Sequence, residues 1–168
     1  MNNKAKAFTL IELLVVLAIV TVLALVFTVA LNPFKRIQES RDSKRQADLQ
    51  SVRSALDIAL TDGTITLTGT ELSPTTGNSK TDTRVADGTG WVKYTLIAES
   101  GLAEQISILP EDPLGNSAPC NGYEFSSDGT YYELKTCFET TKYQGYYTTD
   151  GGNNADRWEL GSKPGLTL

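Results

Sequence analysis

An unbroken apolar run near the N-terminus constrains this chain more than any other feature. It extends from Phe8 to Leu31, 24 residues, and Glu12 is its only ionisable side chain. As a helix rising about 1.5 Å per residue, the run would be about 36 Å long and would cross a hydrocarbon core of about 30 Å. A carboxylate in such a helix costs about 2.5–3.5 kcal/mol at mid-membrane and less near the edge, so Glu12 is predicted to have a function and a partner.

The residues just before this carboxylate carry the strongest motif. Residues 4–12 read Lys-Ala-Lys-Ala-Phe-Thr-Leu-Ile-Glu, which resembles the N-terminus of type IV prepilins and the related pseudopilins. The resemblance implies cleavage by a prepilin peptidase between Ala7 and Phe8, on the cytoplasmic side, and N-methylation of the new Phe8 amine. That family usually has glycine before the cut. Ala7 is also small, so we expect slower processing at worst.

The same resemblance gives Glu12 a partner. In that family the carboxylate at this position faces the N-terminal amine of a neighbouring subunit, within a filament core built from the apolar helices. An acid and an amine that are each costly alone in an apolar bundle offset one another when they pair. Removing one of them strands a charge at a cost of about 3–5 kcal/mol. Glu12 is therefore predicted to set the register of assembly against the Phe8 amine of another copy.

Three other interpretations of the apolar run compete with this one. A secretory signal peptide cut after Ala30 would need an apolar stretch far longer than the usual length of about 7–15 residues, and that stretch would contain an acid. A lipoprotein is excluded because no cysteine precedes Cys120. A plain single-span anchor, with Glu12 reaching the interface, stays open.

The basic residues around the run conflict with the orientation that the motif implies. Lys35, Arg36, Arg41, Lys44 and Arg45 follow the run, whereas Lys4, Lys6 and the amino terminus precede it. The positive-inside rule alone would place the larger domain in the cytoplasm. Because the cleavage motif requires the opposite orientation, we predict a single span of the cytoplasmic membrane with the C-terminal domain outside.

The helix is predicted to continue through residues 32–60. Pro33 interrupts it, because proline lacks a backbone donor and clashes with the preceding turn. A kinked continuous helix and a new helix that starts at Pro33 are both compatible with this. Apolar residues then recur at helical spacing and would pack on a sheet: Leu49, Val52, Leu56, Ala59 and Leu60.

Residues 61–168 are predicted to form a globular head in three parts. Residues 61–90 are rich in threonine and glycine and read as a variable surface loop with one short strand at 65–67. Residues 91–139 would hold a short helix that starts at Leu96, a rigid turn and a hairpin. Residues 140–168 would form a C-terminal loop region.

The hairpin is predicted around Asp128-Gly129, a strong turn signal between two strand-like runs. A two-residue loop at these positions would place Cys120 opposite Cys137, with Cα atoms about 4.5 Å apart and within disulfide range. A disulfide fits the extracytoplasmic side and would contribute about 3 kcal/mol in the chain-entropy model. Two free thiols, a metal pair and a three-residue loop in a shifted register stay open.

Two segments of the head resemble the major pseudopilin of type II secretion. Residues 109–116, Leu-Pro-Glu-Asp-Pro-Leu-Gly-Asn, are similar to the turn that leads into its sheet. Residues 147–158 are similar to a shortened form of its calcium loop, and this resemblance points to Asp150, Asn153 and Asp156 as ligands. Calcium needs six to eight oxygen ligands. An Asx-rich turn without an ion is the alternative, and no cofactor is required.

Composition excludes several other classes of function. The chain has no histidine, the commonest metal ligand and the usual general base. Residues 61–168 hold seven basic and fifteen acidic side chains, a balance that repels phosphate and does not favour nucleic-acid binding. The sequence has no nucleophile-and-base constellation, phosphate loop or zinc spacing, so the chain is predicted not to be an enzyme.

These features predict an α+β fold in which one long N-terminal helix packs by its second half on a small antiparallel β-sheet. The resemblance implies a structural subunit of a type IV pilus or related filament, a helical homo-oligomer built by the pilus assembly machinery of the inner membrane. The alternatives are a pseudopilin of a type II secretion or DNA-uptake machine and a membrane-tethered monomeric binding module. The precursor would lie in the membrane, and the assembled filament would be extracellular.

Overall fold

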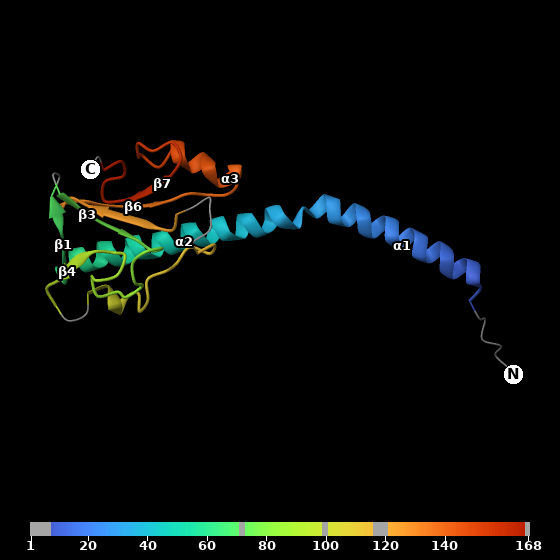
Figure 1. Ribbon diagram of the computed structural model, residues 1–168, viewed down its shortest axis with the longest axis horizontal. Coiled ribbons are helices and arrows are strands. Elements are labelled where there is room, and N and C mark those ends of the chain that lie inside the picture. The colour runs from blue at the N-terminus through green and yellow to red at the C-terminus, as the bar shows by residue number, and fades with distance from the viewer. Residues whose placement is uncertain (1–7, 71–72, 99–100, 116–120, 167–168) are drawn as a thin grey trace. The chain divides into compact units, whose positions relative to one another are not determined.

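The structure is a computed structural model that describes residues 8–70, 73–98, 101–115 and 121–166 (Figure 1). The chain divides into two compact units, Met1–Ile37 and Gln38–Leu168, and each is described by itself. The division falls inside the second helix rather than at its ends. The elements in chain order are α1 (Leu10–Leu31), α2 (Pro33–Thr61), β1 (Ile65–Leu67), β2 (Gly69–Thr70), β3 (Ser73–Asn78), β4 (Tyr94–Leu96), η1 (Gly101–Glu104), β5 (Glu124–Ser127), β6 (Tyr132–Thr136), α3 (Thr141–Gln144), η2 (Gly145–Thr148) and β7 (Trp158–Gly161).

The first unit contains α1 and the start of α2. Asn32 separates them with a left-handed backbone, φ 36° and ψ 71°, a conformation that asparagine tolerates better than most residues. Its side-chain Oδ1 accepts a hydrogen bond from the Lys35 N–H at 3.3 Å, as an N-cap residue does. Pro33 then occupies the first helical position, where its missing donor costs little. The break predicted at Pro33 is therefore the start of a new helix.

The second half of α2 carries the predicted apolar stripe. Leu49, Val52, Leu56 and Ala59 are buried, and Leu60 is half-buried. The helix ends at Thr61, as the Asp62-Gly63 pair indicates, with Gly63 at φ 68°.

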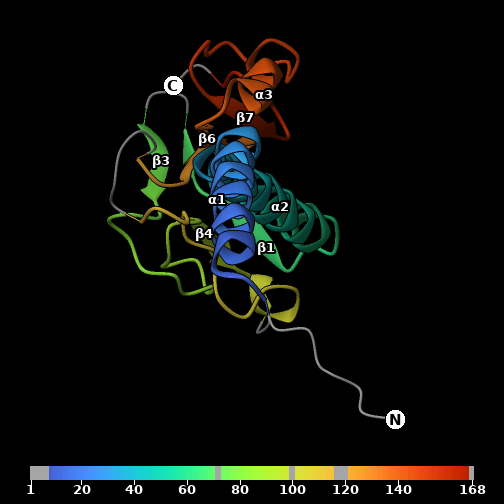
Figure 2. The same ribbon diagram turned by 90° about the vertical axis from the view of Figure 1, so that its right-hand side faces the viewer.

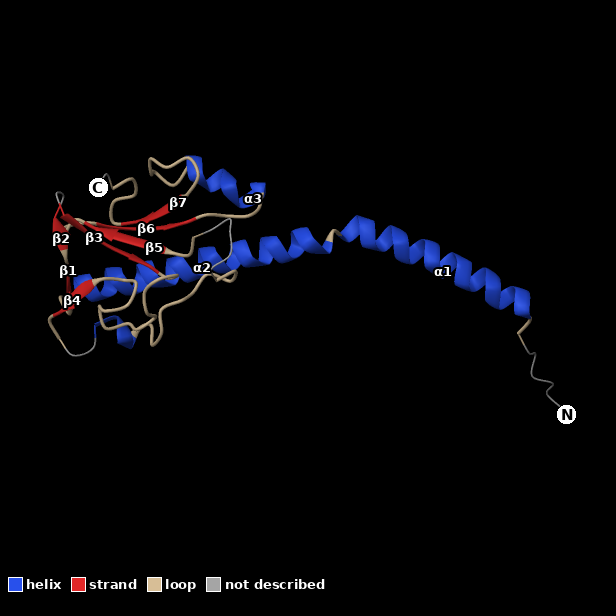
Figure 3. Ribbon diagram, in the orientation of Figure 1, coloured by secondary structure: helices blue, strands red, loops and turns tan. Residues whose placement is uncertain are grey.

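The strands form two antiparallel sheets, one with two strands in the order β1-β4 and one with five in the order β2-β3-β5-β6-β7. Figures 1 and 3 show the larger sheet running along α2. Phe125 of β5 and Leu134 of β6 are register partners, and both belong to the core that contains the buried face of α2. The predicted packing of the helix on an antiparallel sheet is confirmed.

Two tyrosines also bond this sheet to the helix. The hydroxyl of Tyr123 donates to Asp48 Oδ2 at 2.8 Å, and that of Tyr132 donates to Asp57 Oδ1 at 2.5 Å. Both rings are fully buried, whereas both aspartates lie at the edge of the buried helix face. Burial and the neighbouring carboxylates raise the pKa of both phenols, which stay protonated donors.

Two regions predicted as loops contain strands. Residues 61–90 include the predicted strand β1, but also β2 and β3, whose threonines suit a pleated surface. Gly77 in β3 lies against the Trp91 backbone, where a Cβ atom would come within 2.0 Å of the carbonyl oxygen. The C-terminal region likewise supplies α3, η2 and the edge strand β7, and α3 lies beyond the sheet from α2 (Figures 1 and 2). β3 is stabilised by pairing with β5 and β7 by pairing with β6, which a local pattern does not reveal.

The short helix predicted from Leu96 lies later in the chain. Leu96 ends β4, and the helical turn η1 begins at Gly101. The turn predicted at 109–116 is present as far as Gly115, whose N–H donates to the Asp112 carbonyl at 2.8 Å. Gly115 has φ 56°, in the left-handed region that favours glycine.

The predicted hairpin is confirmed, but its predicted register is wrong by two residues. Ser127 pairs with Tyr132, so the loop is centred on Gly129-Thr130 rather than on Asp128-Gly129. The Asp128 carboxylate accepts hydrogen bonds from the N–H groups of Thr130 and Tyr131, which fixes Asp128 directly after the end of β5, before the loop. Gly129 takes φ 88°, as the first loop residue of a type II′ turn must.

Candidate assembly site at the start of the apolar helix

Thr9 and Glu12 form a capping box at the start of α1. The Thr9 hydroxyl accepts a hydrogen bond from the Glu12 N–H at 3.3 Å, and Glu12 Oε2 accepts from the Thr9 N–H at 2.9 Å. The Thr9 hydroxyl also donates to the same carboxylate oxygen at 2.8 Å. Two of the free N–H groups of the first turn are thereby satisfied, and the box orients the Glu12 carboxylate toward the end of the helix.

The surroundings of this carboxylate are apolar and unpacked. Leu10, Ile11 and Leu13 are 83%, 69% and 57% exposed, and Glu12 is itself exposed. Among the described residues, no lysine or arginine forms an ion pair with Glu12. The charge thus has a hydrogen-bond partner but no countercharge within the described part of the chain.

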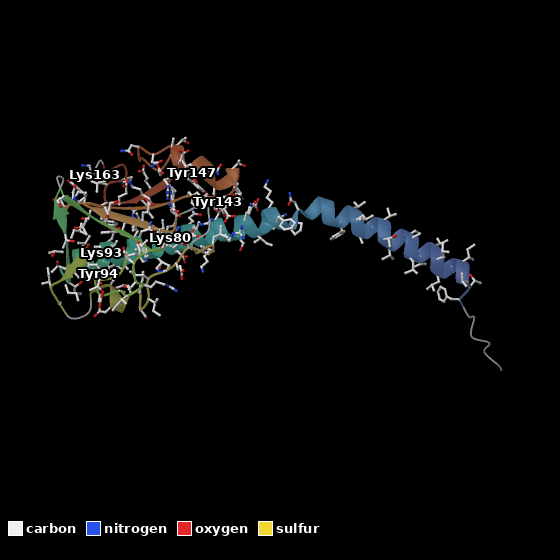
Figure 4. All side chains as sticks on the ribbon, in the orientation of Figure 1. Lys80, Lys93, Tyr94, Tyr143, Tyr147 and Lys163 are labelled. Carbon is white, nitrogen blue, oxygen red and sulfur yellow. The ribbon has the colours of Figure 1, made fainter. Side chains whose placement is uncertain are left out.

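The helix behind the capping box has the length and composition of a membrane span. The window Leu10–Phe27 has a mean hydropathy of 3.1, and none of it is buried. Its side chains project outward from the helix (Figure 4). A long apolar helix with every side exposed needs lipid or other apolar helices as its surroundings.

Comparison with protein families identifies this segment. A family model described as the prokaryotic N-terminal methylation motif matches residues 2–28. The chain carries the prepilin motif of type IV pilins and pseudopilins. No curated protein and no solved structure matches the chain. The α+β architecture, with a long apolar helix followed by a helix packed on antiparallel strands, is pilin-like.

The prepilin motif places the predicted processing residues at the start of this site. Phe8 is 82% exposed and directly precedes the Thr9 cap. Ala7, on the other side of the predicted cut, lies outside the described residues. The motif implies a membrane-anchored precursor that is processed by a prepilin peptidase and assembled into a multi-subunit filament.

Only one of the two cysteines of the predicted disulfide lies in the part of the chain that the structure describes. Cys137 is buried beyond the end of β6, and Cys120 lies outside the described residues. The observed register no longer places these two positions directly opposite one another, and the ladder of β5 and β6 ends at the pair Glu124 and Lys135. The pairing of the two cysteines stays a prediction.

The three predicted calcium ligands lie in the loop between η2 and β7 and are held by hydrogen bonds. Both carboxylate oxygens of Asp150 accept backbone N–H groups, those of Gly152 and Glu159, at 2.9 Å. The side-chain amide of Asn153 donates to the Gly165 carbonyl, and Asp156 is exposed. In the described part of the chain no group of three acidic or sulfur ligands converges on one point.

Two buried glutamates organise this loop and the tail after β7. Glu159 Oε2 accepts the N–H groups of Asn153 and Asn154 at 2.6 and 3.0 Å. Glu133 Oε1 accepts the Gly165 N–H at 2.5 Å, and its other oxygen lies 2.6 Å from Lys135 Nζ. Lys135 Nζ is also 3.9 Å from Glu159. An ammonium group therefore occupies the position between the two carboxylates.

Sequence reasoning missed a buried charge cluster centred on Arg45. Its guanidinium is fully buried and makes two hydrogen bonds to Asp112, at 2.7 and 3.0 Å. It also donates to Asp42 at 2.8 Å and to Glu139 at 2.7 Å. Burial by itself would lower the pKa of Arg45, but the bonds to Asp112 and Glu139 raise it overall, so the group stays charged.

The carboxylates of this cluster also bind the backbone and a second arginine. Asp42 accepts the N–H groups of Glu139 and Thr140, both at 2.9 Å, and Arg41 pairs with Glu139. The cluster joins α2, the 109–115 turn and the segment after β6. A signal was present: Asp42 and Arg45 continue the spacing of Leu49 and Val52 back along α2, which places them on its buried face.

Proposed function

We propose that this chain is a structural subunit of a type IV pilus or a closely related pilin-like filament. Cleavage after Ala7 would free the Phe8 amine, which is then methylated, and the apolar helices of many copies would form the filament core. The Glu12 carboxylate of one copy would pair with the Phe8 amine of another. The chain would act as a building block and not as an enzyme.

One combination of observations carries this proposal. The methylation motif, which matches residues 2–28, includes most of an apolar helix whose only carboxylate is capped but has no countercharge among the described residues. The capping box directs that carboxylate toward the end of the helix, where the new amine forms. A carboxylate in these apolar surroundings is costly alone, and a cationic partner from another copy of the chain would compensate its charge.

The processing part is tested by intact mass and N-terminal sequencing of the protein from its native cell surface. We expect a chain that begins at methylated Phe8. A chain that retains Met1 would contradict the proposal and favour a membrane-tethered monomeric module, and one that begins at Leu31 would indicate an ordinary secreted domain.

The assembly part is tested by two substitutions of Glu12. Glu12→Ala removes both the charge and the capping acceptor, whereas Glu12→Gln keeps an acceptor that suits a capping box. We expect processed monomer in the membrane but no regular filaments for both variants, because each strands the Phe8 amine at a cost of about 3–5 kcal/mol. Filaments of normal abundance from Glu12→Gln would show that capping, and not charge pairing, is what Glu12 contributes.

Filament length separates the two closest alternatives. Overexpression of a pilus subunit would extend long fibres from the cell, whereas a pseudopilin of a type II secretion or DNA-uptake machine acts as a short piston. Thin-section or negative-stain imaging of cells that overproduce the chain makes this distinction. The motif is common to both classes, so the proposal of a pilus depends on this result.

We also propose that Cys120 and Cys137 form a disulfide in the mature protein. An oxidising, extracytoplasmic location and the burial of Cys137 support the pairing. Intact mass under non-reducing conditions should be lower by two hydrogen atoms than after reduction. Alkylation of both cysteines without prior reduction would contradict it.

A further inference from the structure

The first turn of α2 exposes two apolar and two basic side chains. Phe34 is 79% exposed and Ile37 is 52% exposed. Lys35 and Arg36 are exposed too, and neither forms an ion pair with any residue that the structure describes. We call these four residues the interfacial turn. On a helix surrounded by water, the exposed Phe34 and Ile37 side chains would cost free energy, and the two basic side chains would have no partner. Exposed apolar groups of this kind mark interaction sites.

The composition of this turn matches the boundary of a membrane. Phe34 and Ile37 are three residues apart and share one face of the helix, whereas Lys35 and Arg36 fall on other faces. Long basic side chains place their stems on apolar surface and their charges in the headgroup layer. Apolar side chains beside them enter the boundary between headgroups and acyl chains.

The position of the turn in the chain fits the same boundary. The 22 residues of α1 rise about 33 Å, slightly more than a hydrocarbon core of about 30 Å. Asn32 and Pro33 then end one helix and start the next. When α1 spans the membrane from its capping box, the interfacial turn begins where the hydrocarbon ends.

Two of the later basic residues are used differently, whereas Lys44 is exposed and forms no ion pair with a described residue. Arg41 pairs with Glu139, and Arg45 is buried among Asp42, Asp112 and Glu139. These two charges are compensated within the head, whereas the two nearest the span are not.

We propose that the interfacial turn binds anionic phospholipid while the chain is a membrane-anchored precursor. Phe34 and Ile37 enter the interface, and Lys35 and Arg36 contact lipid phosphates on the outer face. This contact holds the span at a defined depth, with Glu12 near the opposite face and ready for assembly. The inference rests on the proposed function only for the membrane-anchored precursor and its orientation, and not for the filament.

The test uses the full-length chain in nanodiscs that contain equal amounts of phosphatidylglycerol and phosphatidylcholine. A photo-crosslinking benzoylphenylalanine replaces Phe34, and mass spectrometry identifies the lipid adducts. The same substitution at Ile58, 42% exposed on α2 within the head unit, is the matched control. We expect lipid adducts at position 34 and few at position 58. Phosphatidylglycerol should exceed phosphatidylcholine in the adducts by at least about threefold, because each basic residue near an anionic surface strengthens binding to that surface by about fivefold.

A second variant identifies the source of the preference. Combining Lys35→Gln and Arg36→Gln should bring the ratio of the two lipids in the adducts close to one, while adducts at position 34 persist. Arg53→Gln, an exposed arginine of the head, should leave the ratio unchanged. A preference that survives the double substitution, or the absence of lipid adducts at position 34, would overturn the inference.

The nanodisc test is independent of filament formation, because each disc holds a single copy. If native membranes give adducts at position 34 with a second copy of the chain in place of lipid, the turn is a subunit contact and the inference is wrong. Loss of filaments in the Glu12 variants with normal lipid adducts would support the lipid contact. Normal processing and filaments without lipid adducts would refute it and leave the proposed function intact.

Discussion

Charged residues have opposite surroundings in the two long helices, α1 and α2. In α1 the only ionisable residue, Glu12, is exposed and has hydrogen bonds from Thr9 but no described countercharge. In α2 the guanidinium of Arg45 is fully buried and bonded to carboxylates from three parts of the chain. The charge in α2 is compensated by folding of one molecule. The charge in α1 has no countercharge among the described residues, which suits the proposed pairing with another copy of the chain.

This contrast separates two kinds of costly charge. A buried ion cluster specifies how one chain packs, and its loss is measured as stability of the monomer. Under the proposed function, the uncompensated carboxylate in the apolar helix would specify how chains meet, and its loss would be measured as a loss of assembly. The four predictions below test this separation, beginning with the largest expected effect.

Arg45→Met should destabilise the head severely. It leaves the carboxylates of Asp112, Asp42 and Glu139 without their common partner, at a cost of about 3–5 kcal/mol. We expect the thermal midpoint of the detergent-solubilised chain to fall by about 10 °C or more. Arg53→Met, in an exposed pair with Asp57 at 3.5 Å, is the control and should cost no more than about 1 kcal/mol. Equal midpoints for both variants would break the comparison.

Acid should weaken the head through Glu139. The hydrogen bond from Arg41 holds the pKa of Glu139 below its ordinary value of 4.5. A carboxyl with a lowered pKa in the folded state adds stability above pH 4.5, and that stability is lost as the pH falls further. Glu139→Gln should be less stable at neutral pH, and its free energy of unfolding should fall less below pH 4.5.

The matched control for this acid dependence is Glu111→Gln, which removes one partner of an exposed pair with Arg84 at 3.3 Å. Its acid dependence should follow that of the wild type, measured by denaturant unfolding across the pH range. Glu133 changes in the opposite sense, because burial raises its pKa, so its carboxylate destabilises the fold as the pH rises above 4.5. A Glu139→Gln curve as steep as the wild type would show that the cluster is not what acid disrupts.

Tyr123→Phe should have a moderate effect on the joint between α2 and the sheet. It removes the hydrogen bond to the Asp48 carboxylate at 2.8 Å but keeps the buried ring. We expect a loss of about 1.5 kcal/mol in the free energy of unfolding, the size typical of a bond to a charged acceptor. Tyr131→Phe, on a ring that is 42% exposed, should change it by less than about 0.5 kcal/mol. If the two variants cost the same, the tyrosine bonds add nothing to the packing.

Calcium should have the smallest effect on stability. Asp150 already accepts two backbone N–H groups, and Lys135 lies between the two buried glutamates of the tail. We expect a chelator to shift the thermal midpoint by less than about 1 °C. A calcium-dependent rise that is lost in Asp150→Asn would establish the predicted site. It would also show that the head binds a partner from outside the chain, as is proposed for α1.

Features that depend on neighbouring residues were predictable. The span, the Pro33 break, the apolar stripe of α2 and the 109–115 turn all follow from residues within a few positions of one another. The hairpin was also predicted, but its register was wrong, because Asp128 binds the backbone of Thr130 and Tyr131 and moves the loop by one position. Strands β3 and β7 were missed because each depends on pairing with a central strand.

The apolar helix, and the single carboxylate that it carries within a prepilin motif, follow from the sequence alone. Length, hydropathy and motif are properties of consecutive residues, so they can be recognised without knowledge of the fold. Which carboxylates surround Arg45 depends instead on how the whole chain folds. Its partners Asp112 and Glu139 lie 67 and 94 residues away along the chain. Burial in a low-dielectric interior strengthens these contacts. No local sequence pattern indicates which distant carboxylates the fold will bring to a buried arginine.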